Sequence, residues 1–218
     1  MITESAKMKK SFSVALSGGT TPELLFSVLG DHYPNSVPWE YVHFFLVYER
    51  CVPPGNPESN YGMTSRKFLE KIDIPSSNIH RIRGEEYPEK EVSRYSEEIS
   101  EYTGRRDGLP LFDLVILGLG VDGHTASIFP GNIELFNSDK ICEVVVHPET
   151  LQKRITITGR VLNNAKSVTF LVTGEKKAGI VDKIINKRSS LNSCPGSFIV
   201  PVHGVLSWLI DEDAGRLL

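Results

Sequence analysis

Short apolar runs alternate along the chain with segments in which apolar residues recur at helical spacing. Four runs are rich in β-branched and aromatic residues and apolar on both faces, as strands buried between two layers of helices are. They span 12–16, 42–47, 112–118 and 167–174. Helical spacing covers 21–30, 59–72, 86–104 and 174–187. This alternation predicts an α/β fold: three layers, doubly wound, with a mainly parallel sheet and helices on both faces.

Two further β-rich segments, 143–146 and 154–159, follow one another with no helical pattern between them. Antiparallel strands can be joined by a short connection, so this pair predicts an antiparallel part of the sheet. We find no linker long enough to divide the chain. We therefore expect one domain over residues 1–218.

Composition excludes several classes of protein. The 218 residues carry a net charge of -3 with scattered lysines and arginines, which does not fit a nucleic-acid binder. Cys51, Cys142 and Cys194 are far apart and have no C-x-x-C spacing, so we expect neither a disulfide framework nor a structural zinc site. The chain has no apolar run long enough for a membrane span, and its start lacks the pattern of a signal peptide. We therefore expect a cytoplasmic protein.

In a doubly wound sheet, function gathers in the loops at the carboxyl ends of the strands. The first strand ends in a loop of Ser17, Gly18, Gly19, Thr20 and Thr21, followed by a proline suited to the first turn of a helix. Glycines let successive N–H groups converge, and a helix N-terminus favours anions. This 17–21 loop is a candidate phosphate site. The same residues also suit an ordinary strand–helix turn, and they alone do not decide between the two.

The fourth predicted strand ends in glycine, with Lys176 and Lys177 in the next helical turn. Lysines at a helix N-terminus are mildly unfavourable against the helix dipole. A solvated surface tolerates them. A nearby bound anion would offset the penalty.

The third predicted strand runs into Gly118, Gly120 and Gly123, a formal match to the G-x-G-x-x-G dinucleotide fingerprint. The fingerprint needs a helix of several turns that begins at the glycines. Pro130 follows only seven residues after Gly123 and limits any helix to a turn or two. We therefore do not predict a dinucleotide site.

The same segment has a second interpretation, because Asp122 and His124 stand two residues apart in a glycine loop. Histidine is the side chain best suited to proton transfer near neutral pH. A carboxylate two residues away could fix its tautomer or charge. On these residues alone, a loop histidine satisfied by local hydrogen bonds is the favoured interpretation.

Taken together, these motifs resemble the 6-phosphogluconolactonase family, which is related to glucosamine-6-phosphate deaminase. The most specific blocks are "ERCVPPGNPESNY" at 49–61 and "GVDGHTASIFPG" at 120–131, and the resemblance extends over almost the whole chain from residue 13 onward. The deaminases share the Asp-Gly-His motif, but "TASIFPG" follows the lactonase pattern.

The resemblance implies hydrolysis of 6-phospho-D-glucono-1,5-lactone to 6-phosphogluconate in the oxidative pentose phosphate pathway. His124 would be the general base that activates water, and Asp122 would orient it. Arg50 would bind the 6-phosphate or stabilise charge on the carbonyl oxygen. The 17–21 loop, Arg154 and Lys177 would supply the other anion contacts. The resemblance implies no metal, no cofactor, no nucleic-acid or membrane partner, and a monomer.

Two departures from the family pattern stand out. Most relatives read "DER" where this chain has Tyr48-Glu49-Arg50, and the larger tyrosine could narrow the pocket. In the deaminases the corresponding aspartate is associated with proton abstraction, so its absence argues against deaminase activity. The segment before Ser17 is also shorter than in relatives, so either a flanking helix is missing or the true start lies upstream. These departures motivate an alternative function, an altered or non-catalytic relative that binds phosphorylated sugars with weak turnover.

Overall fold

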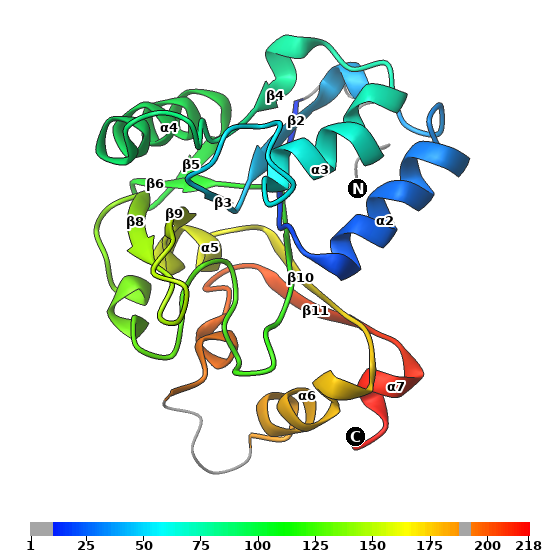
Figure 1. Cartoon of the computed structure of the whole chain (residues 1–218), viewed down its shortest axis with the longest axis vertical. Coiled ribbons are helices and arrows are strands. Elements are labelled where there is room, and N and C mark those ends of the chain that lie inside the picture. The colour runs from blue at the N-terminus through cyan, green and yellow to red at the C-terminus, as the bar shows by residue number, and fades with distance from the viewer. Residues whose placement is uncertain (1–10, 188–192) are drawn as a thin grey trace.

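A computed structural model describes residues 11–187 and 193–218 (Figure 1). The centre of the molecule is a six-stranded parallel sheet with the strand order β11-β10-β7-β1-β2-β4. Its strands are β1 (Phe12–Leu16), β2 (Val42–Leu46), β4 (Ile79–His80), β7 (Leu114–Leu117), β10 (Ser167–Val172) and β11 (Val205–Ile210). The predicted α/β fold with a parallel central sheet is confirmed. The predicted shortening before Ser17 concerns mainly residues 1–10, which lie outside the described residues.

The chain reverses direction across the sheet between β1 and β7, which are parallel neighbours with Val14 opposite Leu114. From β1 it moves to β2 and β4, and from β7 it moves to β10 and β11. Because crossovers between parallel strands are right-handed, the two directions of travel place their helices on opposite faces of the sheet. A crevice opens at the carboxyl ends of the strands where the direction reverses.

Helices surround this sheet (Figure 1). They are α2 (Thr20–His32), α3 (Asn60–Lys67), α4 (Pro88–Tyr102), α5 (Gly159–Asn163), α6 (Ala178–Ile185) and α7 (Glu212–Gly215). Pro88 opens α4, where a residue without an N–H costs nothing, and buried positions recur every four residues at Glu91, Tyr95 and Ile99. The Tyr95 hydroxyl accepts from the Leu46 N–H and donates to the Leu46 carbonyl, both at 2.8 Å, which joins α4 to β2. Short 3₁₀ turns complete the connections, among them Glu175–Lys177 after β10.

The predicted antiparallel pair is real, but it forms a separate sheet. This three-stranded sheet has the order β3-β9-β8, with β3 (Tyr48–Arg50), β8 (Cys142–Val146) and β9 (Lys153–Ile157). It begins where β2 leaves the parallel sheet: the Val47 N–H donates to Leu16 O at 2.9 Å, and Val47 O accepts from the Ile157 N–H at 2.9 Å. One buried residue thus joins both sheets. A small hairpin of β5 (Gly104–Arg106) and β6 (Leu109–Leu111) lies apart from them.

Candidate active site

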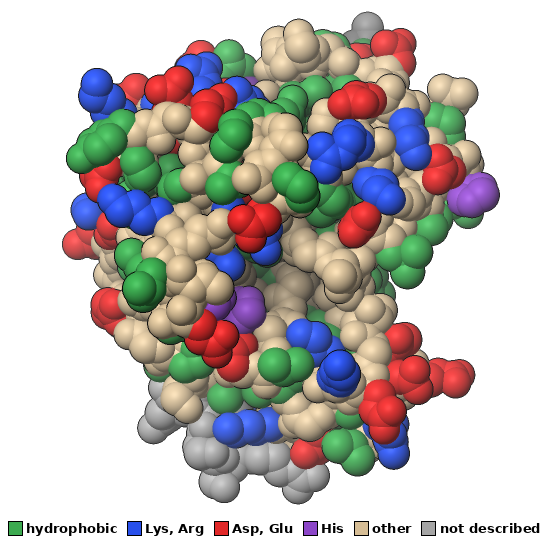
Figure 2. Space-filling view, in the orientation of Figure 1, with side chains coloured by type: hydrophobic (Ala, Val, Ile, Leu, Met, Phe, Trp, Pro, Cys, Tyr) green, Lys and Arg blue, Asp and Glu red, His purple; other side chains and the backbone are tan. Residues whose placement is uncertain are grey.

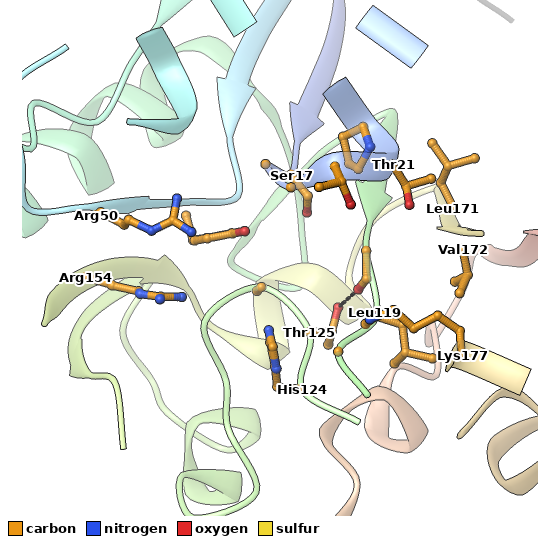
Figure 3. Close-up of a pocket in the computed structure, with 18 of the residues that line it drawn as sticks. Ser17, Thr21, Arg50, Leu119, His124, Thr125, Arg154, Leu171, Val172 and Lys177 are labelled. Atoms are coloured by element: carbon orange, nitrogen blue, oxygen red, sulfur yellow. Dashed lines mark hydrogen bonds between the residues drawn. The ribbon is translucent and has the colours of Figure 1, made fainter. Parts of the chain in front are cut away.

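A cavity of about 320 Å³ lies at the reversal point of the parallel sheet and extends to the antiparallel sheet. Figure 2 shows a hollow in this face of the molecule, with cationic side chains and a histidine at its walls. The loops after β1, β7 and β10 contribute to its lining, and so do β3 and β9. Figure 3 shows Arg50 and Arg154 reaching in from one side and Lys177 from the other, with Ser17 and Thr21 between them.

The 17–21 loop forms one wall, and all five of its residues line the cavity. Gly19 has a φ of 111°, which disfavours residues with a side chain. A Cβ at Gly18 would lie 1.9 Å from Asn60 Oδ1, so only glycine lets the loop approach α3 so closely. Helix α2 begins at Thr20 and directs the partial positive charge of its N-terminus to this wall. Ser17 is buried, and its hydroxyl has no hydrogen-bond partner within residues 11–187 and 193–218.

Two arginines face each other on the opposite wall, because Arg50 of β3 is the direct cross-strand partner of Arg154 of β9. Arg154 is only 7% exposed, and its Nε has no partner in the described part of the chain. Burial and then the Arg50 charge lower the pKa of Arg154. Like charges directly opposite on a sheet are unfavourable unless something offsets them. No carboxylate forms a salt bridge with either arginine among the described residues, so a bound anion is the natural counter-charge.

A buried carboxylate holds Arg50 in place. Glu49 is 1% exposed and accepts hydrogen bonds from the Arg50, Asn60 and Tyr61 N–H groups at 2.7 to 2.8 Å, and from the Ser59 hydroxyl at 3.0 Å. Burial raises the pKa of Glu49, and these hydrogen bonds oppose the rise. Arg50 Nη1 in turn donates to Asn60 Oδ1 at 3.1 Å. Glu49 therefore fixes β3 against the start of α3 and leaves part of the Arg50 guanidinium for the cavity.

Tyr48 also lines the cavity. The side chain is 8% exposed, and burial raises the pKa of its phenol although the Arg50 and Arg154 charges oppose the rise. The phenol is therefore neutral and adds no negative charge beside the two arginines. The residue occupies space in the cavity wall.

His124 and Asp122 meet in the loop after β7. Asp122 Oδ1 accepts from His124 Nδ1 at 2.7 Å and from the His124 backbone N–H at 3.1 Å. Burial alone would raise the pKa of Asp122, but the hydrogen bond and charge of His124 lower it to about 2. The proton on Nδ1 faces the carboxylate, so the neutral ring keeps the lone pair of Nε2. Asp122 does not line the cavity itself, whereas His124 does.

Glycines shape this loop for the histidine. A Cβ at Gly120 would lie 2.2 Å from His124 Nδ1 and 2.4 Å from Asp122 Oδ1. Gly123 has a φ of 85°. The segment 118–132 contains no helix, so nothing continues from the glycines to hold a pyrophosphate. The glycines of the dinucleotide fingerprint serve the Asp122–His124 pair instead.

Lys177 reaches the cavity from the 3₁₀ turn after β10. Its Nζ donates to Leu119 O at 2.6 Å, which places the ammonium beside the loop after β7. Burial lowers the pKa of Lys177, and the Asp122 charge opposes that effect. Lys176 does not line the cavity. The structure thus brings together the residues predicted from sequence, from five separate stretches of chain.

Sequence reasoning missed His147, which lines the cavity from the turn between β8 and β9. It also missed Phe129, a buried ring whose centroid lies 5.0 Å from the His124 ring, 4.8 Å from the His147 ring and 5.5 Å from the Arg154 guanidinium carbon. The sequence signal that could have indicated His147 is its position directly after β8, the strand that pairs with β9. No group of three or more His, Cys, Asp or Glu side chains arranged to hold a metal ion occurs in the described ranges. The same ranges contain no helix long and apolar enough to cross a membrane.

Comparison with known proteins places this geometry in a family. The model of the glucosamine-6-phosphate isomerases/6-phosphogluconolactonases matches residues 1–208. A 6-phosphogluconolactonase of Haemophilus influenzae is 41% identical over 206 residues, which cover 94% of this chain and 87% of that protein. One of Treponema pallidum is 38% identical over 209 residues, which cover 96% and 82%.

Solved structures agree with the sequence comparison. The crystal structure of the devB protein superimposes with a TM-score of 0.93 at 37% identity, over 99% of this chain and 90% of that one. The 6-phosphogluconolactonase of Trypanosoma brucei gives a TM-score of 0.88 at 28% identity, over 100% and 90%. The chain therefore belongs to the glucosamine-6-phosphate isomerase/6-phosphogluconolactonase family.

Proposed function

We propose that this protein is a 6-phosphogluconolactonase, which hydrolyses 6-phospho-D-glucono-1,5-lactone to 6-phosphogluconate in the oxidative pentose phosphate pathway. The observation that carries the proposal is one cavity that combines an oriented histidine–aspartate pair with three cations, Arg50, Arg154 and Lys177, that have no carboxylate partner in the described structure. The relatives that bear this activity in their names match nearly the whole chain.

In the proposed mechanism His124 is the general base. Its Nε2 takes a proton from water while the water oxygen bonds to the lactone carbonyl carbon. In the tetrahedral intermediate the former carbonyl oxygen is negative, and a cation at the cavity wall stabilises it. The bond from this carbon to the ring oxygen then breaks, and Nε2 returns its proton to the departing oxygen. Asp122 remains ionised and holds the ring in the tautomer that this transfer needs.

The phosphate contacts in this proposal come from the 17–21 loop, Arg154 and Lys177. The loop offers the N-terminus of a helix and an unpartnered serine hydroxyl. Arg50 either joins them or stabilises the oxyanion. A comparison of substrates distinguishes these two roles of Arg50, because an unphosphorylated lactone needs only the stabilisation of the oxyanion.

The experiment compares turnover of 6-phosphogluconolactone and gluconolactone after subtraction of spontaneous hydrolysis. We expect the phosphorylated lactone to be strongly preferred. Lys177→Ala should weaken binding of 6-phosphogluconate by about 1.5–3 kcal/mol, the scale of a hydrogen bond to a charged group, and should not affect gluconolactone. Lys176→Ala is the matched control and should change neither.

Two outcomes would overturn the proposal. Equal turnover of both lactones would mean that the cavity has no phosphate site. Binding of 6-phosphogluconate without catalysed turnover would favour the alternative, a phosphosugar-binding relative.

We further propose that residues 1–218 act as one domain, as a monomer and in the cytoplasm. The cavity supports a single domain, because its lining extends from Ser17 to Lys177 and takes residues from the parallel sheet and from the three-stranded antiparallel sheet. Cys51, Cys142 and Cys194 are all free thiols, as expected in a reducing compartment.

A further inference from the structure

A second histidine, His147, is held rigidly at the cavity wall. It follows β8 directly, and its backbone closes the turn to β9: the His147 N–H donates to Gln152 O, and the Leu151 N–H donates to His147 O, both at 3.0 Å. The residue lines the cavity together with His124 and Arg154. Its place is thus set by the antiparallel sheet that also carries Arg154.

Hydrogen bonds within the turn decide which nitrogen of this ring carries the proton. His147 Nδ1 accepts from the backbone N–H groups of Glu149 and Thr150, each at 3.2 Å. Two donors aimed at Nδ1 exclude a proton there, so the proton lies on Nε2. Burial and then the Arg154 charge lower the pKa of His147, with Glu149 opposing them. The ring is therefore a neutral donor rather than a base or a cation.

Ring packing fixes the direction of that donor. The His147 ring contacts Phe129 edge-on, with 4.8 Å between the centroids and 68° between the planes. The Arg154 guanidinium lies over the same Phe129 ring, which also packs against His124. Nε2–H has no hydrogen-bond partner among the residues that the structure describes. A fixed, neutral and unpartnered donor on the wall of a substrate cavity suits an acceptor on the substrate.

We propose that His147 determines specificity by donating its Nε2–H to a hydroxyl oxygen of the sugar lactone. This inference rests on the proposed function. Arg50, Arg154 and Lys177 already supply charge for a phosphate, to which a neutral imidazole adds none. A sugar hydroxyl is uncharged and matches a neutral donor. A donor built to meet a substrate hydroxyl also rejects analogues that lack it, because the donor is then left unpaired.

Two substitutions of His147 test its Nε2–H donor separately from the hydrogen bonds that its Nδ1 makes within the turn. In His147→Asn the amide oxygen can still accept from the turn N–H groups, as Nδ1 does, but nothing reaches the position of Nε2. In His147→Gln the longer amide can place an N–H near that position. Exposed His32 of α2, outside the cavity, gives the control His32→Asn. The melting temperature of each variant reports whether the turn still folds.

The measurements are kcat and KM for 6-phosphogluconolactone, and inhibition by 6-phosphogluconate and by inorganic phosphate alone. We expect His147→Asn to weaken inhibition by 6-phosphogluconate and to lower kcat/KM by about 3- to 10-fold, the scale of one neutral hydrogen bond. Inhibition by inorganic phosphate should stay within about twofold, because the lost contact is to a hydroxyl. His147→Gln should recover most of the loss, and His32→Asn should match the wild type.

Two results would overturn the inference. An equal loss of inhibition by 6-phosphogluconate and by inorganic phosphate would place His147 in the phosphate site. No change in either would mean that it does not touch the substrate. If the wild type itself neither hydrolyses the lactone nor binds 6-phosphogluconate, the proposed function is wrong. That result differs from the two outcomes above, which concern the His147 variants of an active enzyme.

Discussion

His124 has what a general base needs in its immediate surroundings. Asp122 occupies Nδ1, Phe129 packs against the ring, and the ring borders the cavity. The sequence showed the Asp-Gly-His spacing but not these contacts. Phe129 comes from the same loop as His124, and Arg154, whose guanidinium lies over the Phe129 ring, comes from a strand of the second sheet.

Replacing this histidine should remove catalysis and spare binding. We expect His124→Ala to lower kcat by about 10²–10⁴-fold, the usual contribution of a positioned general base. Binding of 6-phosphogluconate should change little, because the cations proposed to hold the phosphate remain. Initial rates corrected for spontaneous hydrolysis, with calorimetry for the product, test this. Retention of more than about a third of the wild-type rate would rule out His124 as the base, given that expected range.

The Asp122–His124 pair also makes the free energy of unfolding depend on pH in the acid range. The pKa of Asp122 in the folded protein is about 2, below its ordinary 3.8, so the unfolded chain binds the proton more tightly. The stabilisation from the pair is therefore fully present above about pH 4 and is lost as the pH falls towards 2. In urea titrations, Asp122→Asn should reduce the steepness of the fall in unfolding free energy between these pH values. An unchanged acid slope would show that the pair contributes no such linkage.

At the scale of elements, the buried strands were the easiest to predict. Strand β1 lies where the apolar run placed it, and all five of its residues are buried. Strand β11 was missed because most of it is exposed or half-buried at the edge of the sheet and it follows a loop rich in glycine and proline. Strand β3 has only three residues, too few for a pattern to show. Its pairing with β9 sets Arg50 opposite Arg154 across about a hundred residues of chain, which no local pattern reveals.

We expect the loop after β7 to depend more on Gly120 than on Gly131. Gly120→Ala would place a Cβ 2.2 Å from His124 Nδ1, so the ring must move and its bond to Asp122 must break or distort. We expect kcat to fall at least about tenfold, since small misplacements of a catalytic group carry large costs in rate. Gly131→Ala in the same loop is the control, because an added Cβ there meets nothing within 4 Å. Similar kcat values for the two variants would contradict this account of the loop.

At the scale of the whole molecule, the cavity brings together positive charges whose mutual repulsion a bound anion can reduce. Arg50 and Arg154 face each other, and Lys177 approaches from the opposite wall. A ligand that binds only the folded state stabilises it by about 2.7 kcal/mol at a hundred times its dissociation constant. For a chain of this size, 6-phosphogluconate at that concentration should raise the melting temperature by about 5–10 °C.

The matched measurement uses two variants. Lys177→Ala at the same ligand concentration should show a smaller rise, and Lys176→Ala should behave like the wild type. A rise of equal size with unphosphorylated gluconate at the same concentration would show that the phosphate group is not what relieves the charge.

Val47, which joins the parallel sheet to the three-stranded sheet, limits where the chain can gain or lose a residue. Val47 is bonded to Leu16 on one side and to Ile157 on the other, and β3 starts immediately after it. Side chains on a strand alternate between faces, so one residue inserted here would move Glu49 into the slot opposite Arg154 that Arg50 now holds. The cavity would gain a carboxylate where it now has a guanidinium. Insertions and deletions in the surface turns leave the charge of the site as it is, but one inserted residue at this junction replaces one of its cations with a carboxylate.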